Sequence, residues 1–390
     1  MKQVALYYPW IHLRGGAERV ILEIARHSRH RWTIFTSHLD QDGTFPEFKT
    51  LPRVVVIDRV PVERSFGRVL RAAVAIAGRR LDLTEFDGLV VVSEGLGDFI
   101  TFRNHAPVTA CLCLTPARPV FDPVYRRAWL ERHRSARLPL ALLSAVYRAL
   151  TRVAWRRYDR VFADSRETSR RIEAGRICPM AKVEVLYPGV NAAAVTPRFA
   201  HDRYFLYAGR LKWTKNVELA IDAFRVFADR SPPADGWRLV VAGAVDAASR
   251  DYVAALRGRA GTDANITFQE NPTDVELARL YAGCCALVFP SLNEDWGIVP
   301  LEAMAHGKPV LAVNRGGPVE SVVHEETGYL LEPVAAAFAG AMRRLAADPA
   351  LGERLGRAGA ARARRFSWEA FVTRLDDYLD GAPLPLNTAS

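Results

Sequence analysis

Short apolar runs rich in β-branched residues alternate with helical patterns along almost the whole chain, and this alternation restricts the fold more than any other feature. Strands that are apolar throughout and separated by helices are typical of parallel sheets covered by helices on both faces. The expected strands are residues 4–9, 32–37, 54–58, 89–93, 108–114, 160–164 and 183–186, then 204–208, 238–242, 266–269, 286–290, 309–313 and 328–331. The sequence therefore predicts an α/β protein with two doubly wound domains.

The domain boundary is expected in the Ala- and Pro-rich segment 188–202, which has no apolar periodicity. A chain of 390 residues, 49% of them apolar, is long enough for two cores of ordinary size. We therefore expect one domain over 1–195, a second over 196–365, and a terminal segment over 366–390 that contains a helix from Ser367 to Leu379. Ligands of such sheets bind beyond the carboxyl ends of the strands, so two facing domains predict a cleft.

Charge is unevenly distributed. The net charge is +10, but residues 1–195 alone carry +12, with 31 Lys and Arg against 19 Asp and Glu. Such a basic half suits an anionic partner, either nucleic acid or an acidic lipid surface. The arginines are not interleaved with the aromatic platforms that stack on bases, so we expect no nucleic acid partner.

The five cysteines are expected to be buried thiols of a reducing compartment, because four of them lie inside apolar runs. The Cys111-x-Cys113 and Cys284-Cys285 spacings differ from the paired Cys-x-x-Cys of a zinc site, and we propose no metal ligands.

No segment is expected to cross a membrane or to act as a signal peptide. The longest apolar stretch, residues 138–154, is shorter than a spanning helix and is interrupted by Pro139 and two arginines. Residues 66–80 and 140–157 mix apolar faces with arginines, as interfacial helices do. The same pattern fits helices that pack inward as core. We expect a cytoplasmic protein, with peripheral association at the cytoplasmic face of the membrane as an open alternative.

Residues 291–309 carry the sharpest signal. They follow an expected strand, turn through a glycine, and open a helix with Pro300 in its first turn. Exposed amides at Gly297, Ile298 and Val299 would make an anion site suited to a diphosphate.

Two glutamates flank this helix start. Glu302, expected in the first turn, could accept hydrogen bonds from ribose hydroxyls, while Glu294 could face a sugar. In an arbitrary sequence, Glu302 would simply complement the helix dipole and Glu294 would be a solvated loop carboxylate.

Basic and glycine-rich loops follow the first strand of each half. After the strand that ends at Ala208, Arg210 and Lys215 precede a helix and could bracket a diphosphate, although a solvated basic loop is an equal alternative on the residues alone. Gly15 and Gly16 allow backbone amides to approach a ligand closely, or form a plain turn.

Taken together, these motifs resemble the retaining glycosyltransferase family 4, the group 1 glycosyl transferases. The Glu294-x7-Glu302 spacing, the flanking Phe-Pro-Ser at 289–291 and the Gly-Gly-Pro-Val-Glu at 316–320 carry the resemblance. Further matches at 187–191 and 366–369 extend it over nearly the whole chain. The resemblance implies the GT-B fold, with two facing Rossmann-like domains and the last helix returning to the first domain.

The resemblance also implies roles for individual residues. Catalytic roles fall on Arg210, Lys215 and Glu294; donor binding on Gly15, Gly16, Gly297, Ile298, Val299 and Glu302; and acceptor binding on Arg118. The segment 111–122 departs from the family pattern, because Leu114 stands where a histidine that reaches the sugar or the acceptor is expected.

The implied reaction is transfer of a hexose, with mannose favoured, from a nucleotide-diphosphate sugar to a glycan or a polyprenol- or other lipid-linked acceptor. The anomeric configuration is retained and no metal or other cofactor is needed. Two alternatives stay open: a nucleotide-sugar epimerase of the same fold, and a non-enzymatic protein that binds an anionic ligand.

Overall fold

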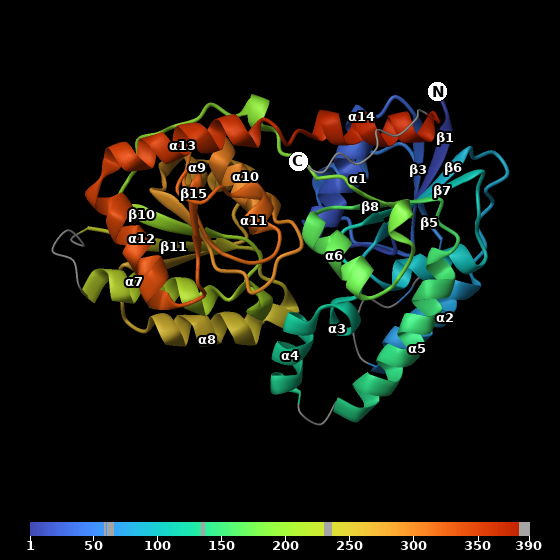
Figure 1. Cartoon of the computed structure of the whole chain (residues 1–390), viewed down its shortest axis with the longest axis horizontal. Coiled ribbons are helices and arrows are strands. Elements are labelled where there is room, and N and C mark those ends of the chain that lie inside the picture. The colour runs from blue at the N-terminus through green and yellow to red at the C-terminus, as the bar shows by residue number, and fades with distance from the viewer. Residues whose placement is uncertain (58–59, 61–65, 134–136, 230–235, 382–390) are drawn as a thin grey trace. The chain divides into compact units, whose positions relative to one another are not determined.

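The computed structural model describes residues 1–57, 60, 66–133, 137–229 and 236–381. The chain divides into two compact units: residues 1–188 with 368–390, and residues 189–367. In each unit helices cover both faces of a parallel sheet (Figure 1). Each unit therefore has the doubly wound α/β architecture that the strand and helix alternation predicts.

The first unit contains a seven-stranded parallel sheet in the order β5-β3-β1-β6-β7-β8-β9. Its strands are β1 (Gln3–Tyr7), β3 (Arg31–Thr36), β5 (Val54–Val56), β6 (Gly88–Ser93), β7 (Val108–Cys113), β8 (Arg160–Ala163) and β9 (Val183–Val185). A second, two-stranded sheet pairs β2 (Trp10–Ile11) with β4 (His38–Leu39). The sequence analysis did not predict β2 and β4, since two-residue strands leave no periodic signal.

Helices of the first unit pack on both faces of this sheet. They are α1 (Gly16–His27), α2 (Phe66–Gly78), α3 (Arg118–Phe121), α4 (Pro123–Arg132), α5 (Arg137–Trp155), α6 (Arg166–Ala174) and α14 (Trp368–Leu379), with the 3₁₀ helix η2 (Leu96–Phe102). Both α2 and α5 pack against η2. Among the described residues, no helix has the length and apolarity needed to span a membrane.

The last helix, α14, joins the first unit through a buried carboxylate. Asp376 accepts hydrogen bonds from Ser28 Oγ at 2.7 Å and from the Arg29 backbone N at 2.9 Å, just beyond the end of α1. Arg374 forms an ion pair with Glu184 of β9, with Nε 2.7 Å from Oε1. Residues 382–390, the end of the predicted terminal segment, lie outside the described residues.

The second unit contains a six-stranded parallel sheet in the order β12-β11-β10-β13-β14-β15. Its strands are β10 (Tyr204–Ala208), β11 (Arg238–Gly243), β12 (Ile266–Glu270), β13 (Ala286–Phe289), β14 (Val310–Val313) and β15 (Gly328–Leu331). Its helices are α7 (Val217–Asp229), α8 (Arg250–Ala260), α9 (Asp274–Gly283), α10 (Ile298–Ala305), α11 (Pro318–Ser321), α12 (Ala335–Ala347) and α13 (Pro349–Ala363).

All thirteen predicted strands are present in the seven-stranded and six-stranded sheets, and the predicted fold class is confirmed. The strand expected over 54–58 is present as β5, which ends at Val56, and Asp58 lies outside the described residues.

The structure divides the chain after residue 188, earlier than the boundary after 195 that the sequence analysis expected. Two backbone hydrogen bonds explain the difference: Val190 N donates to Phe366 O at 2.9 Å and Arg198 N donates to His306 O at 3.1 Å. These bonds hold the connecting segment against the second unit before β10 begins.

Candidate functional site

The large sheet of each unit has one point at which the strand order reverses direction. In the six-stranded sheet of the second unit this point lies between β10 and β13, and in the seven-stranded sheet of the first unit it lies between β1 and β6. Ligands of doubly wound sheets bind beyond the carboxyl ends of the strands at such a point. The loops that follow these four strands are therefore where each unit is built to bind a ligand.

In the second unit, the loops after β10 and β13 are joined directly. Leu292 N donates to Thr214 O at 3.3 Å. In the first of these loops, the Tyr207 hydroxyl donates to the carbonyl of Arg210 at 2.9 Å, while the Arg210 side chain is exposed. The loop ends in the 3₁₀ turn η6 (Trp213–Lys215) just before α7. Arg210 and Lys215 are thus both placed at the reversal point.

Lys215 forms an ion pair with Glu294 across the two loops. Their side chains are 18% and 13% exposed, respectively. Ser291 Oγ donates to the same Glu294 oxygen, Oε2, at 2.9 Å. Because partial burial lowers the local dielectric, this pair is stronger than one on an open surface. The site therefore holds a fixed ammonium group next to a fixed carboxylate.

Gly297 is required by the backbone at the start of α10. Its φ is +86°, and a Cβ there would lie 3.2 Å from both Glu294 Cγ and Phe289 Cζ. The glycine turn lets the chain enter α10 immediately, so the amides of Gly297, Ile298 and Val299 lie at the helix N-terminus. The first amides of a helix have no intrahelical acceptor and carry the positive end of its dipole.

A second glycine turn supports the Glu294 loop. Gly317 N donates to Glu294 O at 2.9 Å. At Gly316, where φ is +71°, a Cβ would lie 2.4 Å from that same carbonyl oxygen. Only a glycine allows this approach, which explains why the Gly-Gly-Pro motif accompanies the glutamate motif.

Glu302 is the fifth residue of α10, so the expectation that it lies in the first turn was wrong. The helix begins one residue after Gly297, which places the carboxylate in the second turn. Its Oε2 accepts a hydrogen bond of 2.8 Å from the Tyr281 hydroxyl of α9. Burial, reinforced by the nearby Glu302 carboxylate, raises the pKa of Tyr281 well above its usual value. The tyrosine therefore stays a donor that fixes Glu302.

Gly15 and Gly16 follow the first strand, at the start of α1, and have different environments. A Cβ at Gly15 would lie 2.7 Å from Glu18 Oε2, whereas nothing lies within 4 Å of a Cβ at Gly16. A side chain at position 15 would therefore meet the Glu18 carboxylate, whereas Gly16 lies beside open space.

Glu18 fixes the loop before these glycines, with Leu13 N donating to its Oε1 at 3.3 Å. The side chain is buried, and burial together with the nearby Glu94 charge raises the pKa of Glu18 to about 7. At the end of β6, Glu94 itself accepts a 3.0 Å hydrogen bond from the Tyr8 hydroxyl.

Arg118 is engaged within its own segment. Its Nε donates to Asp122 Oδ2 at 3.1 Å, and Asp122 also caps α4 by accepting from Tyr125 N at 3.0 Å. The structure thus shows the arginine paired with Asp122, and its predicted contact with an acceptor stays a prediction. Leu114, at the position of the family histidine, is partly exposed.

Several other polar groups have plain structural explanations. Asp40 accepts from the amides of Asp42 and Gly43 in a turn, each at 3.1 Å. The five cysteines carry free thiols, and burial raises the pKa of Cys111 and Cys178 to about 11. In the described part of the chain, no three His, Cys, Asp or Glu side chains gather as a metal site would require.

Comparison with known proteins relates the second unit to a known family. Residues 192–362, which include both loops of the second-unit site, match the family model described as "Glycosyl transferases group 1". Together with the relatives described next, this match shows that the chain is an enzyme, a hexosyltransferase.

Similar proteins span almost the whole chain. The alpha-1,3/1,6-mannosyltransferase ALG2 of Mus musculus is 29% identical, covering 94% of this chain and 93% of its own length. The human ALG2 is 29% identical over 94% and 92%. A D-inositol 3-phosphate glycosyltransferase of Arthrobacter sp. (strain FB24) is 30% identical over 52% of this chain and 53% of its own length.

Solved structures show the same fold. Anabaena HepE in complex with UDP and glucose superposes with a TM-score of 0.73 at 18% identity, covering 98% of this chain and all of that one. Sucrose-phosphate synthase from Thermosynechococcus elongatus gives a TM-score of 0.74 at 20% identity, covering 98% and 99%. The chain therefore has the GT-B fold class that the sequence analysis predicts.

Two residues of the second-unit site were not predicted from the sequence. Tyr281, which holds Glu302, comes from a different helix, and Ser291, which holds Glu294, was named only as part of the motif. Tyr281 belongs to no recognisable spacing. The helical pattern before β13 would have indicated only that Tyr281 faces the core.

Proposed function

We propose that this enzyme transfers mannose from a nucleotide-diphosphate sugar to a glycan or lipid-linked acceptor, with retention of the anomeric configuration. The main support is the near-full-length similarity to the mannosyltransferase ALG2, combined with the Lys215–Glu294 pair beside the start of α10. The ALG2 relatives act as mannosyltransferases, and the fixed groups of the second unit suit a donor with one diphosphate and one sugar.

In this proposal, Lys215, Arg210 and the amides at Gly297, Ile298 and Val299 bind the diphosphate. Departure of a nucleoside diphosphate builds negative charge on the leaving phosphate, and preorganised positive groups stabilise that transition state. A lysine ammonium has three N–H donors, so Lys215 can keep its bond to Glu294 and still donate to a phosphate oxygen. These fixed groups supply the charge that a metal ion supplies in other enzymes, so the proposed reaction needs no cofactor.

Glu302 would bind the ribose and Glu294 the transferred sugar. A carboxylate offers about four lone-pair directions, so Glu302 can accept from ribose hydroxyls in addition to Tyr281. The hydrogen bond from Ser291 and the ion pair with Lys215 hold the Glu294 carboxylate in one orientation. Such orientation is what selection among sugar hydroxyls requires.

The first unit would bind the acceptor near Arg118, with Gly15 and Gly16 serving the donor, and would associate peripherally with the cytoplasmic face of a membrane. The basic excess of residues 1–195 supports an anionic surface as the partner. A lipid-linked acceptor would be presented at that surface.

A donor panel tests the proposal. GDP, UDP and ADP are first compared for thermal stabilisation, because a ligand of the native state raises its apparent stability. The mannose and glucose derivatives of the stabilising nucleotide are then incubated with a lipid-linked oligosaccharide acceptor. We expect transfer of mannose. Release of a rearranged sugar without any acceptor would instead indicate an epimerase, and stabilisation by none of the nucleotides would contradict the proposed donor site.

A further inference from the structure

The outer face of α5 is apolar, which is the reverse of an ordinary surface helix. From residue 141 to residue 153 its exposed positions recur with helical spacing, and apart from Arg152 they are all Ala, Leu or Val: Ala141, Leu142, Ala145, Val146, Ala149, Leu150 and Val153. Leu142 is 72% exposed and Val146 is 52% exposed. We call these seven residues the α5 stripe. A helix packed on a soluble domain normally turns such a face inward.

The inner face of α5 shows that this orientation is set by the fold. Ser144 and Thr151 are buried on the side that packs against the unit, and Arg148 there donates to Val120 O at 2.9 Å. Tyr147 packs on Phe99 of η2 with ring centroids 5.5 Å apart. Because polar groups are buried while the apolar stripe is exposed, the stripe has the character of a contact surface.

The charge around the stripe has one sign. From residue 123 to residue 157 the sequence contains nine arginines and a single acidic residue, Glu131. Arg152, and Arg156 and Arg157 in the turn that follows α5, are exposed and continue the outward side of the helix. The outer face therefore changes from apolar to basic at its C-terminal end.

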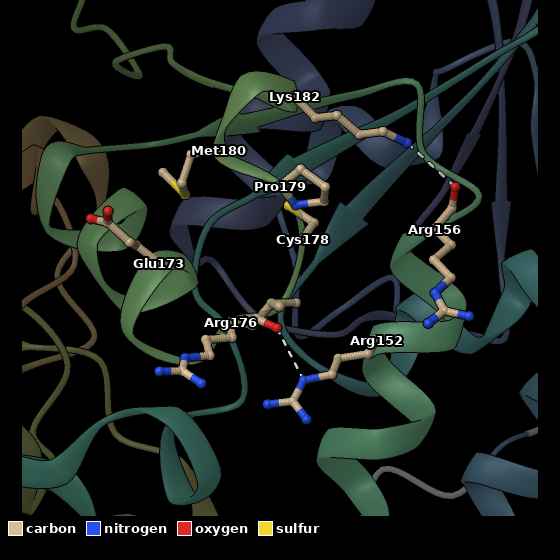
Figure 2. Close-up of a pocket in the computed structure, with 9 residues that line it drawn as sticks. Arg152, Arg156, Glu173, Arg176, Cys178, Pro179, Met180 and Lys182 are labelled. Atoms are coloured by element: carbon tan, nitrogen blue, oxygen red, sulfur yellow. Dashed lines mark hydrogen bonds between the residues drawn. The ribbon is translucent and has the colours of Figure 1, made fainter.

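A basic pocket of about 470 Å³ adjoins this end. Four cations line it, Arg152, Arg156, Arg176 and Lys182, with Glu173 as the one acidic lining residue. Figure 2 shows Arg152 and Arg156 at the end of the helix and Arg176 across from Arg152. Arg152 Nε donates to Arg176 O at 3.0 Å, and Lys182 Nζ to Tyr158 O at 2.6 Å, so both side chains are held at the rim.

Arg156 and Arg176 are exposed at the same rim. Such an arrangement of cations in a concave site suits a phosphate group.

We propose that the α5 stripe and the basic pocket form one docking surface for an anionic lipid bilayer. The stripe inserts into the boundary between headgroups and acyl chains, parallel to the membrane plane, and the pocket binds a lipid phosphate. This inference rests on the peripheral membrane association in the proposed function and locates it on the first unit, where a lipid-linked acceptor would be met at the same surface.

Charge favours a bilayer over a second copy of the chain. α5 contains no acidic residue, so the same surface on another copy would bring arginines and no counter-charge. Anionic headgroups provide that counter-charge, and acyl chains accept the stripe. Helix α2, which also packs on η2, carries exposed Leu70 and Val74 and no acidic residue, and Figure 1 draws it on the same side of the first unit.

Vesicle flotation of the full chain tests the docking surface. Phosphatidylcholine vesicles are compared with vesicles of equal parts phosphatidylcholine and phosphatidylglycerol, at low and high salt. We expect binding to the anionic vesicles only, weakened by salt. A basic residue near an anionic surface contributes about a fivefold factor, so Arg152→Glu/Arg156→Glu should lower partitioning by about 25-fold or more. Leu142→Glu/Val146→Glu should abolish flotation.

Matched controls come from the second unit. Val275→Glu replaces a valine that is 62% exposed on α9, and Arg250→Glu reverses an exposed arginine at the start of α8. Both should float as the unchanged protein does, and all variants should keep its thermal unfolding midpoint. Equal loss in Val275→Glu, equal binding to neutral vesicles, or a solution dimer that Leu142→Glu/Val146→Glu dissociates would each overturn the docking surface.

Transfer assays separate this inference from the proposed function. Stripe variants should keep transfer to a water-soluble acceptor and lose transfer to a vesicle-bound one. An unchanged protein that floats with anionic vesicles but transfers no mannose would contradict the proposed function and leave the docking surface standing. Normal transfer of mannose without flotation would contradict the docking surface and leave the proposed transfer reaction standing.

Discussion

At the scale of single residues, the proposed chemistry depends on two cations at the reversal point between β10 and β13. Arg210 is exposed beyond β10, while Lys215 is mostly buried and paired with Glu294. A donor phosphate would therefore meet one exposed cation and one that is held by an ion pair. A fixed charge needs no reorganisation when the leaving group becomes negative.

We predict that Arg210→Ala and Lys215→Ala each lower turnover by about 100-fold, the scale of losing one preorganised electrostatic group. Steady-state kinetics with the donor identified by the panel measure this loss. Arg250→Ala, at an exposed site of the same unit, is the control and should change turnover little. Near-normal turnover in both test variants would remove the two residues from the mechanism.

Glu18 gives the stability of the first unit a dependence on pH. Burial raises its pKa to about 7 from an ordinary value of 4.5, so the folded state binds the proton more tightly than the unfolded state. The stabilisation is complete below pH 4.5 and is lost as the pH rises through 7. We therefore expect Glu18→Gln to gain stability relative to the unchanged protein across this range, by up to about 3 kcal/mol.

Thermal unfolding of both proteins between pH 5 and pH 8 checks this expectation. Glu85→Gln, which alters an exposed carboxylate of the same unit, is the control. A difference between Glu18→Gln and the unchanged protein that stays constant with pH would show that Glu18 is ionised throughout.

At the scale of elements, strands were predictable and contacts between loops were not. Buried parallel strands are continuous apolar runs, which is why β10 and β13 could be located from the sequence alone. That these two strands are neighbours depends on strand order, which periodicity does not encode. The Lys215–Glu294 pair follows from that order and was therefore not predicted.

Helix α5 shows a second limit. Its apolar periodicity was visible in the sequence, but periodicity does not tell whether the apolar face of a helix packs on the core or faces the solvent. Both orientations of α5 fit the same sequence pattern. Only the burial of Ser144 and Thr151 and the exposure of Leu142 distinguish them.

Helix α14 is held on the first unit in part by a buried carboxylate. Asp376 is 2% exposed and accepts from Ser28 and Arg29. We predict that Asp376→Asn costs about 1–3 kcal/mol, because an amide nitrogen would replace one acceptor oxygen next to a donor. Calorimetry should show a lower Tm for the first unit, by about 2–4 °C per kcal/mol.

The adjacent Asp377 is the matched control. Its side chain is 43% exposed and pairs with Arg29 at 2.7 Å, so Asp377→Asn should cost little, as exposed ion pairs do. Equal losses in the two variants would contradict the special role given to Asp376.

At the scale of the whole molecule, the chemistry is divided between the two halves of the chain. The basic excess lies entirely in residues 1–195, since the net charge of the remainder is negative. The two cations proposed to bind the donor lie in the second unit, where an ion pair with Glu294 holds Lys215. This division suits an enzyme that binds a charged surface with one unit and stabilises one leaving group with the other.

The last prediction concerns the stereochemistry of the complete reaction: the product keeps the donor's anomeric configuration without a covalent sugar–enzyme intermediate. Retention by double displacement needs a carboxylate nucleophile and a second acid about 5 Å away. Glu294 is held by Lys215 and Ser291, and the resemblance assigns Glu302 to the ribose, so the loop that carries Glu294 does not supply this pair. The acceptor should then attack from the face that the diphosphate leaves, with a phosphate oxygen taking its proton. Proton NMR of the anomeric position reports the configuration, and inversion would refute the assignment. Mass spectrometry of the enzyme during turnover is the complementary measurement, since a glycosylated Glu294 would establish double displacement in its place.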